Sequence, residues 1–163
     1  MGGQGRRTAD AEAAPLIIGW RERVALPDWG IASIKTKIDT GARTSAIHVD
    51  NLELLPGNRV GFDVIVATGG PGTEPRRVPV ETDIVRISRV RLSHGRRQQR
   101  PVVATRMRLG SVERTIELSL VSRTHMLCRM LLGRMALKGN FLVDPGRARR
   151  LPRPTVDRRG RKS

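Results

Sequence analysis

The sequence is poor in cysteine, in aromatic residues and in long apolar runs. Its 163 residues include one cysteine, two tryptophans, two phenylalanines and no tyrosine. A lone cysteine excludes an intramolecular disulfide framework, and no apolar run approaches the roughly 18 residues of a membrane-spanning helix. The N-terminal stretch also lacks an apolar segment of signal-peptide length. We therefore expect a soluble, cytoplasmic protein without a membrane anchor.

Acidic residues are also scarce relative to basic ones. The chain has 31 Lys and Arg against 15 Asp and Glu, for a formal net charge of +16. Residues 147–163 hold eight basic residues and one acidic residue, and we predict a disordered tail there. This tail is either an arm that binds polyanions such as RNA, the ribosome or an acidic protein, or a solvated end without a partner. Residues 1–15 are also predicted to be unstructured.

Between these ends the apolar residues recur with period two, which is typical of half-buried strands. Ile34, Thr36 and Ile38 alternate with two lysines, and Val60 to Val66 alternate in the same way. Two further alternating runs flank the turn Gly110–Ser111 and predict a hairpin over 103–120. The only helical candidate is short, Arg134 to Lys138. We predict one all-β domain over 16–146, a closed barrel with one short C-terminal helix.

The tripeptide Asp39-Thr40-Gly41 follows the amphipathic strand 34–38. An aspartic peptidase needs a carboxylate at such a strand end, because two aspartates share one proton and activate a water molecule between them. Glycine after the Asp-Thr pair lets the backbone approach the carboxylate. About ninety residues later comes Met130-Leu131-Leu132-Gly133-Arg134, an apolar segment followed by Gly-Arg.

Together these segments make the chain similar to the retropepsin-like aspartic peptidases, and among them to the RimB-type proteins, also catalogued as ATP-dependent zinc proteases. The similarity extends from Ile17 to Pro145. The matching stretches are Ile18–Glu22, Val24–Pro27, Gly30–Ile31, Ile34–His48, Arg129–Arg134 and Val143–Pro145.

This resemblance implies an acid-protease barrel and hydrolysis of peptide bonds by an Asp-activated water. It implies a catalytic loop of Asp39, Thr40 and Gly41, and a flap near Ala67 to Thr73. The residues that it implies as supporting or substrate-binding groups are Ala42, Arg43, His48, Leu132, Gly133 and Arg134.

Two features depart from the viral retropepsins. Where those enzymes carry an acidic partner for the arginine of their Gly-Arg element, this chain offers Arg43, so we expect Arg134 to pair with Asp50. Basic groups near the site favour a substrate rich in Glu or Asp. RimB-type proteins are associated with the glutamate ligase RimK, so the resemblance implies processing of glutamate-rich peptides, with a RimK-like ligase or the ribosome as partner.

The second departure concerns the other aspartate of the catalytic pair. No other Asp in the chain is followed by Thr-Gly or Ser-Gly. A symmetric homodimer, with Asp39 from each chain at the two-fold axis, would supply both carboxylates. The alternatives are a monomer with a different second carboxylate, or no peptidase activity.

Metal and nucleotide sites have weak support in the sequence. The candidate metal ligands are His48, His94, His125 and Cys128, but there is no His-Glu-x-x-His and no Cys-x-x-Cys. No P-loop motif is present either. We predict no metal and no cofactor.

Two functions of different classes therefore stay open. The first is an aspartic peptidase that depends on Asp39. The second is a nonenzymatic basic β-barrel that binds the ribosome, RNA or an acidic protein, for which Asp39 would be replaceable. Binding of the second kind would weaken steeply with salt.

Overall fold

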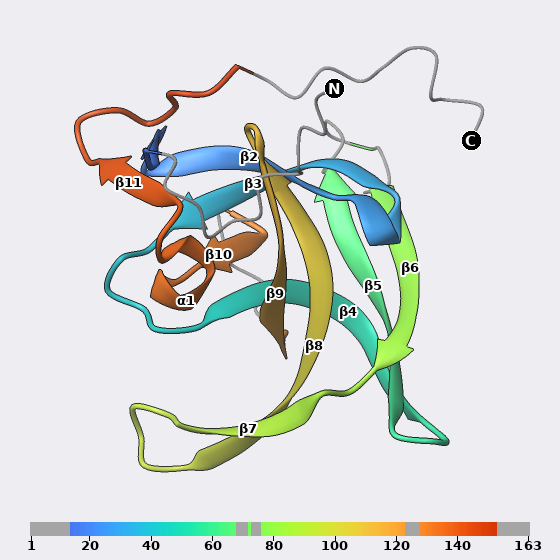
Figure 1. Ribbon diagram of the computed structural model, residues 1–163. Coiled ribbons are helices and arrows are strands. Elements are labelled where there is room, and N and C mark those ends of the chain that lie inside the picture. The colour runs from blue at the N-terminus through green and yellow to red at the C-terminus, as the bar shows by residue number, and fades with distance from the viewer. Residues whose placement is uncertain (1–13, 68–71, 73–75, 123–127, 153–163) are drawn as a thin grey trace, which may run out of the picture.

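The computed structural model describes residues 14–67, 72, 76–122 and 128–152. Most of these residues lie in strands, joined by one short α-helix and one 3-10 helix (Figure 1). The strands are β1 (Leu16–Gly19), β2 (Arg21–Leu26), β3 (Ile31–Ile38), β4 (Ser45–Leu55), β5 (Arg59–Ala67), β6 (Arg76–Asp83), β7 (Arg86–Arg91), β8 (Arg97–Leu109), β9 (Val112–Val121), β10 (Met130–Leu132) and β11 (Phe141–Asp144). The helices are η1 (Pro27–Trp29) and α1 (Arg134–Leu137).

Six of the strands close into a barrel in the order β10-β3-β2-β8-β9-β4. The short strand β10 completes the ring, because it pairs in parallel with β3 and antiparallel with β4. Met130 lies opposite both Thr36 and Ile47. The predicted all-β closed barrel with one short helix is therefore confirmed.

The remaining strands extend or flank this ring. β5 and β6 continue the sheet outward from β4, and β7 pairs with the first half of β8 as a projecting hairpin (Figure 1). β1 and β11 form a separate parallel pair that joins the two ends of the described chain. Among the described residues, no helix has the length and apolar character needed to cross a membrane.

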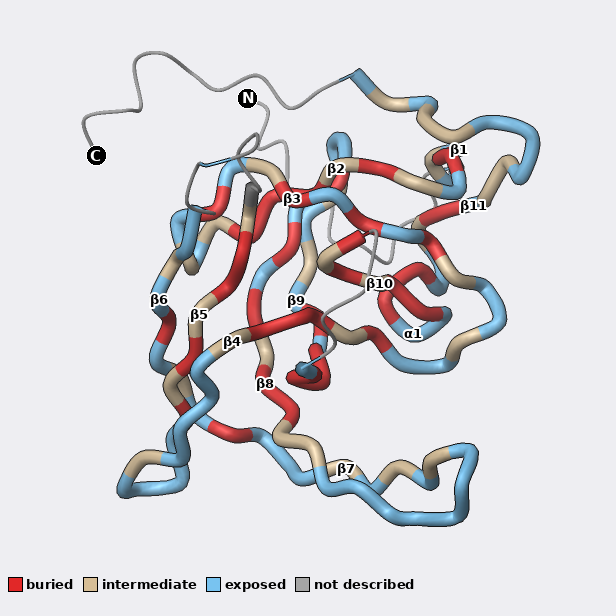
Figure 2. The backbone as a smooth tube through the Cα atoms, turned by 180° about the vertical axis from the view of Figure 1, so that it is seen from behind, coloured by how far each residue is buried: buried red, intermediate tan, exposed pale blue. Residues whose placement is uncertain are grey.

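The core follows from the alternation that the sequence shows. In β3 the side chains of Ile34, Thr36 and Ile38 are buried, while Lys35 and Lys37 are exposed. Buried positions from the barrel strands line its interior in this way (Figure 2). Because successive side chains of a strand point to opposite faces, one face of β3 packs into the core and the other meets solvent.

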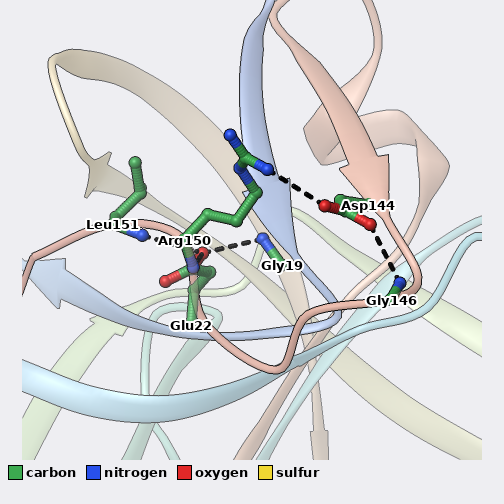
Figure 3. A network of polar contacts seen from close by, with 6 residues as sticks. All are labelled: Gly19, Glu22, Asp144, Gly146, Arg150 and Leu151. Atoms are coloured by element: carbon green, nitrogen blue, oxygen red, sulfur yellow. Dashed lines mark hydrogen bonds and ion pairs between the residues drawn. The ribbon is translucent and has the colours of Figure 1, made fainter.

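Residues 147–151 form a strap across β1 and β2. The backbone N–H of Trp20 donates to the Arg147 carbonyl at 3.0 Å. The buried Glu22 then accepts three backbone N–H donors on one carboxylate oxygen, from Gly19 at 2.8 Å, Arg150 at 2.9 Å and Leu151 at 3.3 Å (Figure 3).

The strap changes the predicted end of the domain. We expected the barrel domain to end at 146 and a disordered tail to begin at 147, but the contacts with Glu22 continue the packed structure to Leu151. The sequence did not indicate this, because three of the four residues 147–150 are arginines, which are usually solvated. The rest of the predicted tail, 153–163, and residues 1–13 lie outside the described residues.

Candidate active site

The Asp39 loop begins where β3 ends. The Asp39 backbone N–H donates to the Leu132 carbonyl at 2.8 Å, which ties the first residue of the loop to β10. The N–H of Gly41 donates to Asp39 Oδ1 at 2.9 Å, and the N–H of Ala42 donates to the Asp39 carbonyl at 3.2 Å. The loop thus fixes the Asp39 carboxylate from its own backbone while leaving this side chain only half-buried.

The segment after β10 lies directly behind this loop. The Gly133 N–H donates to Ser45 Oγ at 3.0 Å, and the Arg134 N–H donates to the Ala42 carbonyl at 2.8 Å. A side chain at position 133 would overlap the Thr44 backbone and lie 2.8 Å from the Ala42 oxygen. Glycine is therefore required here for the close approach of two backbones. The structure brings these segments together, although about ninety residues separate them.

Arg134 has a different partner from the one expected. Its Nη1 donates to the carbonyl oxygen of Thr40 at 3.0 Å and so holds the loop through the backbone. Asp50, the predicted partner, instead accepts from Arg77 Nη1 at 2.7 Å and lies 3.4 Å from His48 Nε2. The pairing with Asp50 was wrong, because Asp50 lies far along β4, where β6 supplies Arg77.

His48 belongs to the barrel wall. It lies in β4 with 1% of its surface exposed, and its backbone N–H donates to the Arg129 carbonyl at 2.8 Å. Burial lowers the pKa of His48, against a smaller opposite effect from Asp50. Its carboxylate neighbour in the structure is Asp50 rather than Asp39.

Two cavities of similar size flank the Asp39 loop, and Arg43 lines both. One, of about 590 Å³, is a mainly apolar groove between Thr40 and β11, with Met135 and Leu142 in its wall. The other, of about 600 Å³, is mainly polar and lies between the loop, α1, β9 and the β7–β8 hairpin. Its wall includes Arg86 of β7, a residue that the sequence analysis did not single out.

The predicted metal candidates are spread over the molecule. His94 is exposed in the turn between β7 and β8, and Cys128 is buried. Within the part of the chain that the structure describes, no three His, Cys, Asp or Glu side chains gather as a metal site. His125 lies outside the described residues, and so does most of the predicted flap, 68–71 and 73.

The closed six-stranded barrel and the Asp-Thr-Gly loop backed by Leu-Gly-Arg define a retropepsin-like protein. The chain matches the RimB-like family, described as the retropepsin-like aspartic endopeptidase RimB, over residues 17–154. It therefore belongs to the RimB-like family.

Curated relatives carry a different name. The chain is 37% identical over 131 residues to a "Probable alpha-L-glutamate ligase" of Shewanella pealeana, and 35% identical over 135 residues to one of Parasynechococcus marenigrum. These matches cover 79% and 80% of this chain but 28% of each relative. The ligase name thus describes much longer proteins, of which this chain resembles one part.

A solved structure also shares the fold. The crystal structure of Lpg0085 from Legionella pneumophila, a protein of unknown function, aligns with a TM-score of 0.66 and 29% sequence identity. The alignment covers 82% of this chain and 96% of the other. The barrel described here is therefore a fold that an experimental structure also shows.

Proposed function

We propose that this protein is an aspartic peptidase in which Asp39 activates a water molecule for attack on a peptide bond. The observation that carries the proposal is the Asp39 loop itself. Its carboxylate receives the Gly41 N–H at 2.9 Å, and Arg134 holds the Thr40 carbonyl at 3.0 Å. Such fixed groups keep the carboxylate in one orientation before the substrate arrives. Membership of the RimB-like family supports the same activity.

The second carboxylate comes from a second copy of the chain. Two aspartates that share one proton can act as base and acid, because like charges so close cannot both ionise. The apolar groove beside Thr40 supports this arrangement, since Met135 and Leu142 in its wall are 53% and 56% exposed. Exposed apolar residues that gather beside a functional loop are typical of an interface.

Acidic or glutamate-rich protein segments are the proposed substrate. The net charge of +16 and the exposed Arg43 beside the loop both attract carboxylates. The relatives named as glutamate ligases support this choice, because they contain a region similar to this chain. We also propose a cytoplasmic location and an association with a RimK-like ligase or with the ribosome.

Mass spectrometry of a glutamate-rich peptide tests the activity. We expect the wild-type protein to cleave the peptide at acid to neutral pH, and Asp39→Asn to lose at least about a thousandfold in rate. A chelator should leave the wild-type rate unchanged. Cleavage that survives Asp39→Asn, or that the chelator abolishes, would rule out the proposed mechanism.

The nonenzymatic alternative has its own support in the excess of basic residues. A basic barrel that only binds the ribosome, RNA or an acidic protein would retain binding in Asp39→Asn and lose it steeply with salt. Absence of cleavage combined with salt-sensitive, Asp39-independent binding would favour this alternative.

A further inference from the structure

The polar cavity lies next to the candidate catalytic loop. Its wall includes Arg43, Thr44 and Ser45, which follow the Asp39-Thr40-Gly41 tripeptide after one residue. Arg86 and Ser88 of β7 also line this cavity. Figures 1 and 2 show the β7–β8 hairpin projecting on the same side of the barrel as α1 and the loop between β3 and β4. A peptide held at Asp39 would thus have this cavity within reach of its neighbouring side chains.

The β7–β8 hairpin is strongly basic. Between Arg86 and Arg100 the chain has six arginines and no acidic residue. All of the β7 arginines are exposed. Exposed charges of one sign raise the local concentration of ligands of the opposite sign. The hairpin therefore surrounds one wall of the cavity with positive potential.

The two arginines in the cavity wall differ in their partners. Within the described residues, no hydrogen bond or ion pair involves the Arg43 guanidinium, and this residue is exposed. Arg86 Nε donates to Glu117 Oε1 at 2.9 Å, and both side chains are about half exposed. An exposed pair of this kind is weak, so a second carboxylate can compete for Arg86 at low cost.

We infer that this cavity is the specificity pocket of the site and that Arg43 and Arg86 bind glutamate or aspartate side chains of the substrate. The inference rests on the proposed peptidase function and adds the residues that select its substrate. Arginine suits this task, because its planar guanidinium can form two parallel hydrogen bonds with one carboxylate. Glu117 lowers the affinity of the pocket for a carboxylate, because it repels an incoming carboxylate and pairs with Arg86 when no substrate is bound.

The test measures binding and cleavage separately. Binding uses the Asp39→Asn protein and fluorescence anisotropy with two labelled peptides, one with repeated glutamates and one with glutamine at each of those positions. We expect Arg43→Ala and Arg86→Ala each to weaken binding of the glutamate peptide by about tenfold. Glu117→Gln should strengthen it. The glutamine peptide should bind poorly to every variant, and cleavage by proteins that retain Asp39 should follow the same order.

Arg59→Ala is the matched control. Arg59 is 45% exposed and lies 3.7 Å from Asp83, in the sheet of β5 and β6, so its loss removes the same charge away from the cavity. If Arg59→Ala weakens binding as much as Arg86→Ala does, long-range charge rather than this pocket selects the ligand, and the inference fails. It also fails if neither peptide binds, or if a single-stranded RNA oligonucleotide competes as well as the glutamate peptide does. Arginine-dependent binding without any cleavage would instead overturn only the peptidase function.

Discussion

The burial of His48 makes the stability of the barrel depend on pH. Because burial lowers its pKa in the folded protein, the unfolded chain binds this proton more readily below pH 6.5. Stability is therefore fully present above 6.5 and falls as the pH drops towards the folded pKa. One proton changes the free energy of unfolding by at most about 1.4 kcal/mol per pH unit. Urea denaturation at pH 7.5 and 5.5 should show this fall, and His48→Gln should reduce it.

The exposed His94 provides the comparison. It lies in the turn between β7 and β8, so His94→Gln should keep the wild-type difference between the two pH values. An equal pH dependence in His48→Gln and the wild type would show that carboxylates rather than His48 cause the fall. Asp50, Arg77 and Arg129 all act on His48, and each is unchanged in both variants.

The sequence predicted the individual residues of the site better than it predicted their hydrogen-bond partners. The short Asp39 loop could be predicted, because the hydrogen bond from Gly41 to Asp39 spans two residues. The contact of Arg134 with the Thr40 carbonyl could not, since any backbone oxygen near the loop was a possible acceptor. Arg86 had no motif to identify it. Only the acid-free stretch around it in the sequence could have drawn attention to it.

The strap over residues 147–151 depends on one buried side chain. Glu22→Gln keeps the shape of Glu22 but weakens three hydrogen bonds from backbone N–H groups. We expect the free energy of unfolding to fall by about 1–3 kcal/mol. The Arg150 and Leu151 amides should also exchange their hydrogens faster. Hydrogen exchange read by mass spectrometry measures both effects in one experiment.

Arg150→Ala is the control for the strap. It removes the ion pair of Arg150 with Asp144 but keeps the backbone N–H that Glu22 accepts. Because both partners of this pair are partly exposed, the loss should stay below about 1 kcal/mol. Equal destabilisation by the two substitutions would mean that the ion pair, rather than Glu22, holds the strap.

Strands were predicted correctly from the sequence where one face of the strand is exposed to solvent. β3, β5 and the β8–β9 hairpin alternate clearly and were predicted near their observed positions. β10 has only three residues and β11 four, too few for a period to show. β4 was not predicted as a strand, because Ile47, His48 and Val49 are buried consecutively and break the alternation.

The proposed dimer concerns the whole molecule and has its own test. Leu142→Glu places a charge in the apolar groove beside Thr40. If a second copy covers this groove, the variant should be monomeric and its cleavage rate should fall by at least about tenfold. Sedimentation velocity reports the association state, and the peptide assay reports the rate.

Leu54→Glu is the matched substitution on another surface. Leu54 is 66% exposed, near the end of β4 that turns into β5, and it lines neither cavity at the Asp39 loop. This variant should retain the wild-type association state and rate. A wild-type protein that is monomeric and fully active would instead favour a second carboxylate within the same chain.

The placement of β10 has a consequence for how the protein folds. This strand completes the ring and supplies the Leu132 carbonyl to Asp39, yet it lies about ninety residues after β3. Contacts between distant parts of a chain slow folding, because the entropy of closing the loop is lost before the contact forms. A ribosome must therefore finish most of the chain before the Asp39 loop can take its final shape. The proposed peptidase activity would therefore arise only after most of the chain has been synthesised, once β10 has closed the ring behind the Asp39 loop.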